Sequence, residues 1–393
     1  MSLRFHWFLP TSGDSRSIFG GGHGLQRGHG KAAATAFRPP SIDYLGQIAR
    51  SAEQLGFEAV LTPTGTWCED AWLVTAALTQ QTRTLKFLVA FRPGFVSPTL
   101  AAQMAATYQR ISGGRLLLNV VTGGETAEQR RFGDHLSKDE RYARTDEFLS
   151  VVRGAWSGTP YDFTGVHYQV EGATVAEVPS PVPELYFGGS SAAAGRVAAK
   201  HVQTYLTWGE PPAQVAEKIA WVRGLAAEEG RTLRFGIRLH VITRDTSEEA
   251  WAEAGRLLAA LDPEDVRTAQ QTLARSDSVG QKRMLALHEG FRRDGGGVHD
   301  LEIHPGLWAG VGLVRGGAGT ALVGSHSEVA DLIEEYAAHG LTEFVLSGYP
   351  HLEEAYWFGE GVLPELRRRG VLGRGVLDGG VLDGGAPAVR LSA

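Results

Sequence analysis

The chain has 393 residues, of which 43 % are hydrophobic and 21 % charged, and its formal net charge is −6. This balance is typical of a globular protein with a large core, and it does not favour a nucleic-acid binder. A single cysteine excludes an internal disulfide and any multi-cysteine metal site. No apolar run approaches a membrane span, and the N-terminus lacks the apolar region of a signal peptide, so we expect a cytoplasmic protein.

Eight short apolar runs alternate with amphipathic segments. The runs typical of strands are 3–10, 58–63, 85–91, 116–122, 184–189, 203–208, 233–243 and 343–350. Helical spacing marks the segments 41–56, 211–230 and 325–340, the last with Ser327 as the N-cap. Eight such units predict a parallel sheet closed into a (β/α)8 TIM barrel, with an open doubly wound sheet as the alternative. No G-x-G-x-x-G follows the first strand, which counts against dinucleotide binding.

Three segments are additional to the strands, helices and short loops of a minimal barrel. Residues 11–40 are rich in glycine and follow the first strand, so they belong at the C-terminal face, where barrel active sites lie. Residues 262–324 combine one or two helices with glycine-punctuated stretches, which predicts a lid. We therefore expect one barrel domain at 1–358 with these insertions, followed at 359–393 by a disordered, low-complexity tail that repeats VLDGG.

The run 233–243 has an unusual polar face. Its alternation places Arg238 and His240 on one side, about 7 Å apart. Two cations at that spacing repel by about 2 kcal/mol at an effective dielectric near ~20. A carboxylate on a neighbouring strand, a neutral histidine or a bound anion would resolve the conflict. Acids in the strand runs stand only at strand starts, at Glu58, Glu184 and Glu343, which favours an anion at the barrel mouth.

Polar residues also follow other strands, as expected of a barrel active site. Asn119 and Thr122 end the fourth run, and Tyr349 and His351 end the eighth. The stretch YFGGSS at 186–191 is either a phosphate cradle or a simple helix N-cap. No metal-site spacing and no nucleophile elbow occurs in the sequence.

Cys68 comes soon after the second strand run. Its ordinary interpretation is a small buried hydrophobic residue. The neighbouring Glu69 and Asp70 are then first-turn acids of the next helix.

Nine motifs, in order, resemble those of the two-component alkanesulfonate monooxygenases that depend on reduced FMN, within the bacterial-luciferase-like flavin monooxygenases. The resemblance covers residues 1–358. The motifs are HWFLPT (6–11), CEDAWLV (68–74), LKFLVAFRPG (85–94), NVVTGG (119–124), LYFGGSS (185–191), YLTWGEPP (205–212), RFGIRLHVI (234–242), GLWAGVGLVRGGAGTALVG (306–324) and SGYPHLEEAY (347–356).

This resemblance implies a homotetramer that receives FMNH2, as a dissociable co-substrate, from a separate NAD(P)H-dependent FMN reductase. With O2, the enzyme would oxygenate the carbon next to the sulfonate and give aldehyde, sulfite, FMN and water, for sulfur acquisition. Arg238 and His240 would hold the sulfonate, stabilise negative charge on the oxygenated flavin, or both. The alternatives are a methanesulfonate or dimethylsulfone monooxygenase, a deazaflavin-dependent reductase, and a non-catalytic anion-binding barrel.

The resemblance also implies roles for individual residues. The catalytic residues would be Cys68, Arg238, His240, Arg315 and Tyr349. FMN contacts would come from Asn119, Thr122, Tyr142, Ser190 and Ser191. Substrate contacts would come from Trp208, Arg238, His240, Arg315 and His351. Ser12 stands where the family commonly has histidine, and Trp67 where it has serine, so we expect these two residues to alter substrate range rather than reaction type.

Overall fold

The computed structural model describes residues 3–18, 37–123, 125–291 and 296–373. Most of the glycine-rich segment 11–40 and both VLDGG repeats lie outside these ranges. Within them, no helix is both long and apolar enough to cross a bilayer.

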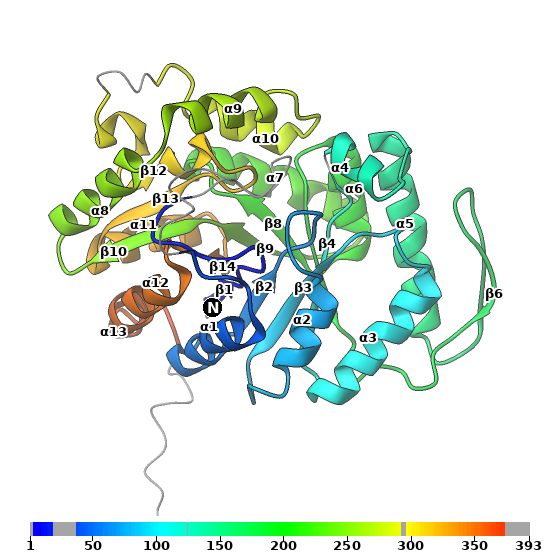
Figure 1. The fold of residues 1–393 in the computed structure, drawn as a ribbon. Coiled ribbons are helices and arrows are strands. Elements are labelled where there is room, and N and C mark those ends of the chain that lie inside the picture. The colour runs from blue at the N-terminus through cyan, green and yellow to red at the C-terminus, as the bar shows by residue number, and fades with distance from the viewer. Residues whose placement is uncertain (1–2, 19–36, 124, 292–295, 374–393) are drawn as a thin grey trace, which may run out of the picture.

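Eight parallel strands close into a barrel, which confirms the predicted fold class (Figure 1). Around the barrel they follow the order β1, β14, β9, β8, β7, β4, β3 and β2. Each lies within one of the eight predicted runs: β1 (Arg4–Phe8), β2 (Ala59–Thr62), β3 (Lys86–Phe91), β4 (Leu116–Val120), β7 (Glu184–Gly188), β8 (Thr204–Trp208), β9 (Arg234–Arg238) and β14 (Glu343–Leu346). A buried cluster drawn only from these strands, including Phe8, Leu88 and Tyr186, fills the barrel interior.

Helices form the outer layer of the barrel (Figure 1). They are α1 (Ile42–Leu55), α2 (Ala71–Leu78), α3 (Pro98–Ser112), α4 (Thr126–Arg131), α5 (Lys138–Ala155), α6 (Ala192–His201), α7 (Pro212–Glu228), α11 (His326–Ala338), α12 (His351–Trp357) and α13 (Leu363–Arg368), with a π-helical turn η4 (Phe358–Val362) before α13. The predicted end of α1 at Gly56 is confirmed by a left-handed φ of 90°.

The predicted N-cap of α11 is wrong by two residues. Ser325, not Ser327, caps the helix, and it forms a capping box with Glu328. The serine side chain accepts from the Glu328 backbone N–H, and the Glu328 carboxylate accepts from the Ser325 backbone N–H. Ser327 is followed three residues later by Ala330, which cannot complete such a box.

A long insertion separates β9 from α11. It contains a four-stranded sheet in the order β10, β13, β12 and β11. Its elements are β10 (His240–Arg244), α8 (Ser247–Ala259), α9 (Pro263–Leu273), α10 (Val279–Ala286), η2 (Val298–Leu301), β11 (Glu302–His304), β12 (Leu307–Trp308), η3 (Gly310–Leu313) and β13 (Ala321–Ser325). Because β10 pairs with β13 along its whole length, the insertion begins earlier than residue 262.

The predicted strand 233–243 is therefore two strands. Leu239 N–H still donates to Val345 O of β14, but His240 N–H donates to Thr320 O of the insertion. The chain leaves the barrel between these two residues. On the other side the pairing continues, because Val241 N–H donates to Ser347 O, and the side chains of Arg238 and His240 both contact the Ser347 hydroxyl, as their predicted common face requires.

Two further segments differ from expectation. A hairpin of β5 (Tyr161–Thr164) and β6 (Gln169–Ala173) lies between α5 and β7, and it stands away from the barrel in Figure 1. At the other end of the chain, α13 lies inside the segment expected to be a disordered tail. Its Leu363 and Leu366 are buried in the main core, so the packed structure continues well past residue 358.

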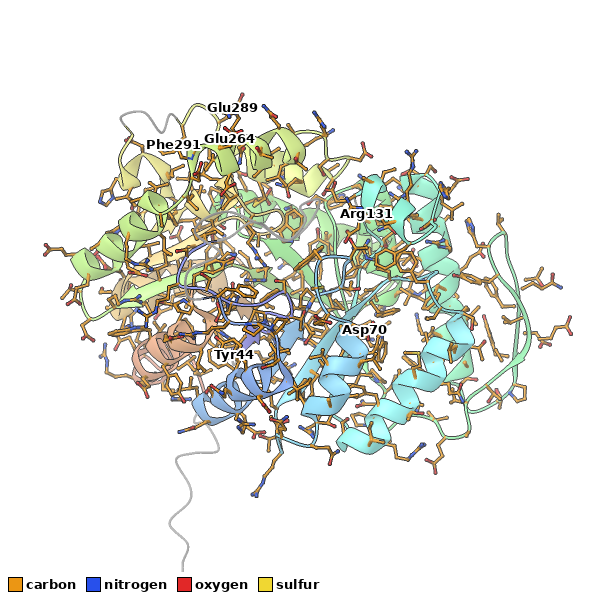
Figure 2. The ribbon with its side chains drawn as sticks, viewed as in Figure 1. Tyr44, Asp70, Arg131, Glu264, Glu289 and Phe291 are labelled. Atoms are coloured by element: carbon orange, nitrogen blue, oxygen red, sulfur yellow. The ribbon has the colours of Figure 1, made fainter. Side chains whose placement is uncertain are left out.

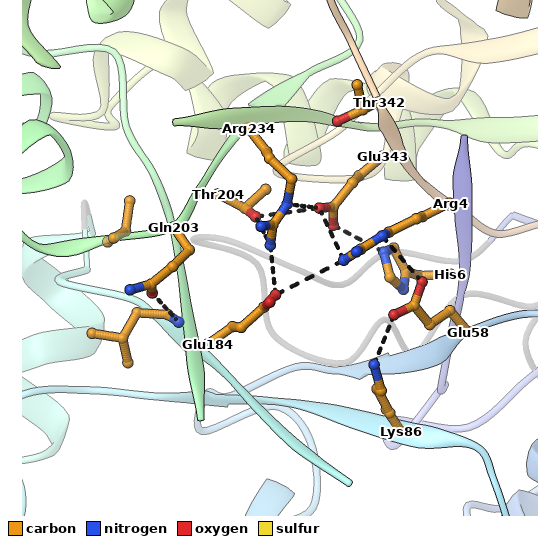
Figure 3. Close-up of polar contacts among 12 residues, drawn as sticks. Arg4, His6, Glu58, Lys86, Glu184, Gln203, Thr204, Arg234, Thr342 and Glu343 are labelled. Atoms are coloured by element: carbon orange, nitrogen blue, oxygen red, sulfur yellow. Dashed lines mark hydrogen bonds and ion pairs between the residues drawn. The ribbon is translucent and has the colours of Figure 1, made fainter. Parts of the chain in front are cut away.

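A network of ion pairs lies at the end of the barrel where the strands begin (Figure 3). Glu343, the first residue of β14, is fully buried. Its carboxylate accepts from Arg234 Nε at 2.8 Å and lies 3.2 Å from His6 Nε2. Arg234 also donates to Glu184 Oε2 at 2.5 Å. The acids at strand starts thus neutralise the first arginine of the 233–243 run.

Replacing Glu343 with glutamine should destabilise the protein by about 1.5–3 kcal/mol, because the substitution removes a fully buried carboxylate from the partly exposed Arg234, which keeps Glu184 as a partner. Burial alone would raise the pKa of Glu343, but hydrogen bonds from His6 and Arg234 outweigh burial and lower the pKa from 4.5 to about 2. Stability from this carboxylate is therefore complete above pH 4.5 and is lost as the pH falls toward 2. Urea unfolding across this pH range measures both effects.

The matched control is Glu177→Gln, because Glu177 is mostly exposed and lies 3.5 Å from Arg110. This surface pair should contribute less than about 1 kcal/mol. Equal losses in the two variants, or a gap between wild type and Glu343→Gln that does not narrow below pH 4.5, would contradict the assignment.

Candidate functional site

A pocket opens at the end of the barrel where the strands finish. Its walls come from the loops after β2, β4 and β7, from the end of β8 and from the insertion. Eight of the predicted site residues line it: Asn119, Thr122, Tyr142, Ser190, Ser191, Trp208, Arg238 and Arg315. Trp67, one of the two departures noted in the sequence, lines it as well. Cys68, His240, Tyr349 and His351 are not part of the lining.

Two arginines make one end of the pocket positive. The guanidinium carbon of Arg238 lies 4.6 Å from the ring centroid of Phe8, and that of Arg315 lies 5.4 Å from the same ring. Both side chains are buried. Arg238 donates to Leu239 O, Val345 O and Ser347 Oγ, all of which are uncharged.

No carboxylate pairs with Arg238 or Arg315 within the described ranges, in contrast to Arg234 at the opposite end. Burial, and then the nearby charge of Arg315, lower the pKa of Arg238 to about 9, so this arginine is still a cation at neutral pH. Two buried cations without a counter-charge form a site that attracts an anion.

His240 and Tyr349 lie behind this positive end. Their rings stack with centroids 5.5 Å apart and an interplanar angle of 15°. Arg315 Nη1 donates to Tyr349 Oη at 3.0 Å. Burial, followed by the charges of Arg238 and Arg315, lowers the pKa of His240 well below its usual value. The histidine is therefore neutral at pH 7, which removes the cation–cation conflict expected from the sequence.

His351 supports the pocket from outside. Its Nδ1 lies 2.8 Å from Asp14 Oδ1, and its backbone N–H donates to Asp14 Oδ2. The ring lies 5.7 Å from Phe8 and 5.2 Å from Tyr349. Burial would raise the pKa of Asp14, but His351 and a hydrogen bond from Tyr44 lower it. The Asp14–His351 pair thus packs against Phe8 and Tyr349. Asp14 was not identified as a supporting residue in the sequence analysis.

Cys68 also lies outside the pocket lining. Its Sγ is 3.6 Å from Gly65 O and 3.7 Å from Pro63 O, so the thiol contacts its own loop. Burial raises the pKa of Cys68 to about 12, which keeps the group a thiol at neutral pH. Nearby, Asp70 caps α2 by accepting from Leu73 N–H at 2.9 Å (Figure 2).

The stretch after β7 forms a cradle at the N-terminus of α6. Ser191 is the N-cap and accepts from Ala194 N–H. A Cβ on Gly189 would lie 2.6 Å from Ala194 Cβ and 3.3 Å from Tyr142 Oη. Only glycine therefore allows the backbone at position 189 to lie this close to Ala194 and Tyr142. Burial raises the pKa of Tyr142, and a hydrogen bond with Ser191 opposes the rise. Free helix N–H groups and hydroxyls are suited to a phosphate.

An acid that the sequence analysis did not single out lines the pocket as well. Glu125 precedes α4 and accepts a hydrogen bond from the hydroxyl of Ser276 in the insertion. Burial raises its pKa. It follows the NVVTGG motif directly, and this position after a strand was the available signal.

Residues 310–320, which we call the arginine loop, are held against the barrel. Gly317 N–H donates to Gln281 Oε1 at 2.9 Å, and Gln270 Nε2 donates to Leu313 O at 2.6 Å. Below them, Arg283 of α10 pairs with the buried Glu210 that follows β8. These contacts hold α9, α10 and the arginine loop together, while the exposed Glu264 of α9 and Glu289 after α10 lie at the outer edge of the insertion (Figure 2).

Comparisons with known proteins agree with this architecture. The structure resembles riboflavin lyase with a TM-score of 0.77 and 22 % identity, over 95 % of this chain and 93 % of that chain. It resembles a long-chain alkane monooxygenase with a TM-score of 0.72 and 19 % identity, over 95 % and 92 % of the two chains. It also resembles the EDTA monooxygenase of Chelativorans sp. BNC1, with a TM-score of 0.71 and 20 % sequence identity over 95 % of each chain.

At these identities the structural likenesses show the fold alone. The sequence itself carries the assignment further, because the model of the family described as luciferase-like monooxygenase matches residues 3–343. That match covers all eight strand starts of the barrel and most of the pocket described above. The chain therefore belongs to the luciferase-like monooxygenase family.

Proposed function

We propose that the protein is a monooxygenase that uses FMNH2 and O2 to convert alkanesulfonates to aldehyde and sulfite, with FMN and water as the other products. One observation carries the choice of substrate: Arg238 and Arg315 present two buried guanidinium groups at one end of the pocket and pair with no carboxylate in the described ranges.

A sulfonate suits this end of the pocket because it is a permanent anion with three acceptor oxygens. Guanidinium groups bind such anions through short, charge-assisted hydrogen bonds. The neighbouring wall is apolar, with Phe8, Leu61 and Leu206, and it also carries Trp67 and Trp208. This combination fits a substrate with an anionic head and an alkyl chain.

The cradle at α6 fits the phosphate of FMN. Gly189 leaves room for close approach, and Ser190, Ser191 and Tyr142 supply hydroxyl groups on the same side of the pocket. Asn119 and Thr122 lie on the pocket wall at the end of β4 and would contact the rest of the flavin. When bound, reduced FMN supplies the electrons that activate O2.

The insertion would exclude water during turnover. The arginine loop contributes Arg315, Gly316, Gly317 and Ala318 to the pocket lining, and α10 contributes Gly280. We further propose that a separate NAD(P)H-dependent reductase delivers the reduced flavin in the cytoplasm, and that the enzyme assembles as a homotetramer.

Sulfite release tests the proposal directly. With an FMN reductase, NAD(P)H and O2, we expect sulfite from octanesulfonate, and the comparison with methanesulfonate measures chain-length preference. Arg238→Ala should lower turnover by about 100-fold or more, because it removes a charged donor in a shielded site. The control is Arg267→Ala, which changes an exposed arginine of α9. Oxygen-independent reduction of substrate, or equal turnover in all three proteins, would contradict the proposal.

Cys68→Ser should retain activity within about tenfold of wild type, since the thiol makes only weak contacts with its own loop. Because this is the chain's single cysteine, thiol titration reports on it without interference. With a pKa of about 12, the thiol should react slowly with iodoacetamide at pH 7.5 to 8. Stoichiometric thiol modification during turnover would show instead that Cys68 is a nucleophile.

Arg315→Ala should lose sulfite production while the protein still binds FMNH2, because the arginine closes the anion end and not the phosphate cradle. If the insertion closes over ligands, limited proteolysis should cut between residues 296 and 320 faster in the free protein than with FMNH2 and octanesulfonate. The Arg267→Ala variant supplies the control from the same insertion. Cleavage unaffected by ligands, together with normal turnover of Arg315→Ala, would leave no role for closure.

A further inference from the structure

Ser347 has no role in the site as described so far, although it is completely buried beside it. The residue follows the last residue of β14. Segments 239–241 and 345–347 run side by side, because Leu239 N–H donates to Val345 O at 3.0 Å and Val241 N–H donates to Ser347 O at 2.8 Å. This pairing continues past the barrel strand and places Ser347 between the side chains of Arg238 and His240.

The hydrogen bonds of the Ser347 hydroxyl have a fixed direction. Arg238 Nη2 lies 2.9 Å from Ser347 Oγ, and His240 Nδ1 lies 2.7 Å from the same oxygen. A guanidinium group can only donate, so the hydroxyl accepts from Arg238. Its single proton is then available for His240 Nδ1, which accepts it when Nδ1 carries no hydrogen.

The contact of the other ring nitrogen, Nε2, shows which of the two nitrogens carries the hydrogen. His240 Nε2 lies 3.2 Å from Ala318 O, and a carbonyl can only accept, so Nε2 carries a hydrogen. A neutral imidazole has one N–H, which leaves Nδ1 unprotonated. Two separate partners, Ser347 on one side and Ala318 on the other, therefore select one tautomer.

We propose that Ser347 is a positioning residue that joins the anion-binding Arg238 to the arginine loop through His240. The hydrogen-bonded chain runs from Arg238 N–H to Ser347, from Ser347 O–H to His240 Nδ1, and from His240 Nε2–H to Ala318 O. Ala318 lies three residues after Arg315, and both line the pocket.

The chain has a consequence for closure. If the arginine loop moves away, His240 Nε2–H loses its acceptor inside a buried site, which is unfavourable. The chain thus favours the seated loop whenever Ser347 holds His240 in the Nε2–H tautomer. Arg315 reaches Tyr349, whose ring stacks on His240, so the loop and the histidine meet at a second point as well.

The first test is independent of any activity and so of the proposed function. Histidine labelled with ¹⁵N reports which ring nitrogen carries the proton, and the His240 signals are assigned as those missing from His240→Gln. Wild type should show protonated Nε2 and unprotonated Nδ1. Ser347→Ala should change this pattern at Nδ1, which loses its hydrogen-bond donor while Nε2–H keeps Ala318 O, and Ser347→Thr, which keeps the hydroxyl, should restore it. The control Ser51→Ala removes a buried hydroxyl of α1 that contacts Tyr356, and neither residue lines the pocket.

The second test uses turnover and therefore rests on the proposed function. Ser347→Ala should lower kcat by roughly 10- to 100-fold, because it leaves buried donors and acceptors without partners. Ser347→Thr should recover most of the loss, and Ser51→Ala should match wild type. Limited proteolysis of the arginine loop in the free protein should be faster in Ser347→Ala than in Ser51→Ala.

These outcomes separate the two ideas. An Nδ1–H tautomer in wild type, or an unchanged pattern in a folded Ser347→Ala, overturns the role of Ser347 whatever the reaction is. The expected tautomer pattern and faster loop proteolysis, without sulfite release from any sulfonate, keep the role of Ser347 and remove only the proposed substrate.

Discussion

The site depends on two buried arginines, Arg238 and Arg315, that pair with no carboxylate among the residues the structure describes. Arg234 and Arg238 lie at the two ends of one five-residue strand, and only Arg234 pairs with acids, namely Glu343 and Glu184. At the other end, Arg238 is held by carbonyl oxygens, a serine hydroxyl and the face of Phe8. Positive charge is therefore neutralised where the strands begin and left available where they end. This division gives the barrel one end stabilised by ion pairs and one positive end whose charge is suited to an anion.

Local pattern was enough to predict the barrel and the outline of the pocket. Strand alternation, helical spacing and glycine stops are properties of short windows, so all eight strands and the ends of α1 and α7 follow from them. Residues that directly follow a strand, such as Thr122 and Ser190, also line the pocket as expected. The β5–β6 hairpin had a signal of the same kind in the alternating Tyr161 and Phe163, but its many polar residues masked it.

What local pattern could not predict was set by contacts between distant segments. The break after Arg238 exists because β13, about 80 residues later in the chain, pairs with β10 and draws His240 out of the barrel. No residue pattern within 233–243 predicts that β13 is the partner of β10. Asp14 and Ser347 were missed for the same reason, since their importance lies in bonds to His351 and to the Arg238–His240 pair. Cys68 and His351, predicted as site residues, lie outside the pocket lining, and the neighbouring Trp67 and Phe8 line it instead.

The way Arg238 is held also explains why the insertion belongs to the site and is more than a cover. A buried guanidinium without a counter-ion needs other partners for its N–H groups, and those of Arg238 are Leu239 O between β9 and β10, Val345 O of β14 and the Ser347 hydroxyl after β14. The break between β9 and β10 exists because the insertion pairs with β10. The same insertion brings Arg315 to 5.4 Å from the Phe8 ring centroid and Ala318 to His240. The positive end therefore needs both parts of the fold, since the barrel holds the first arginine and the insertion supplies the second.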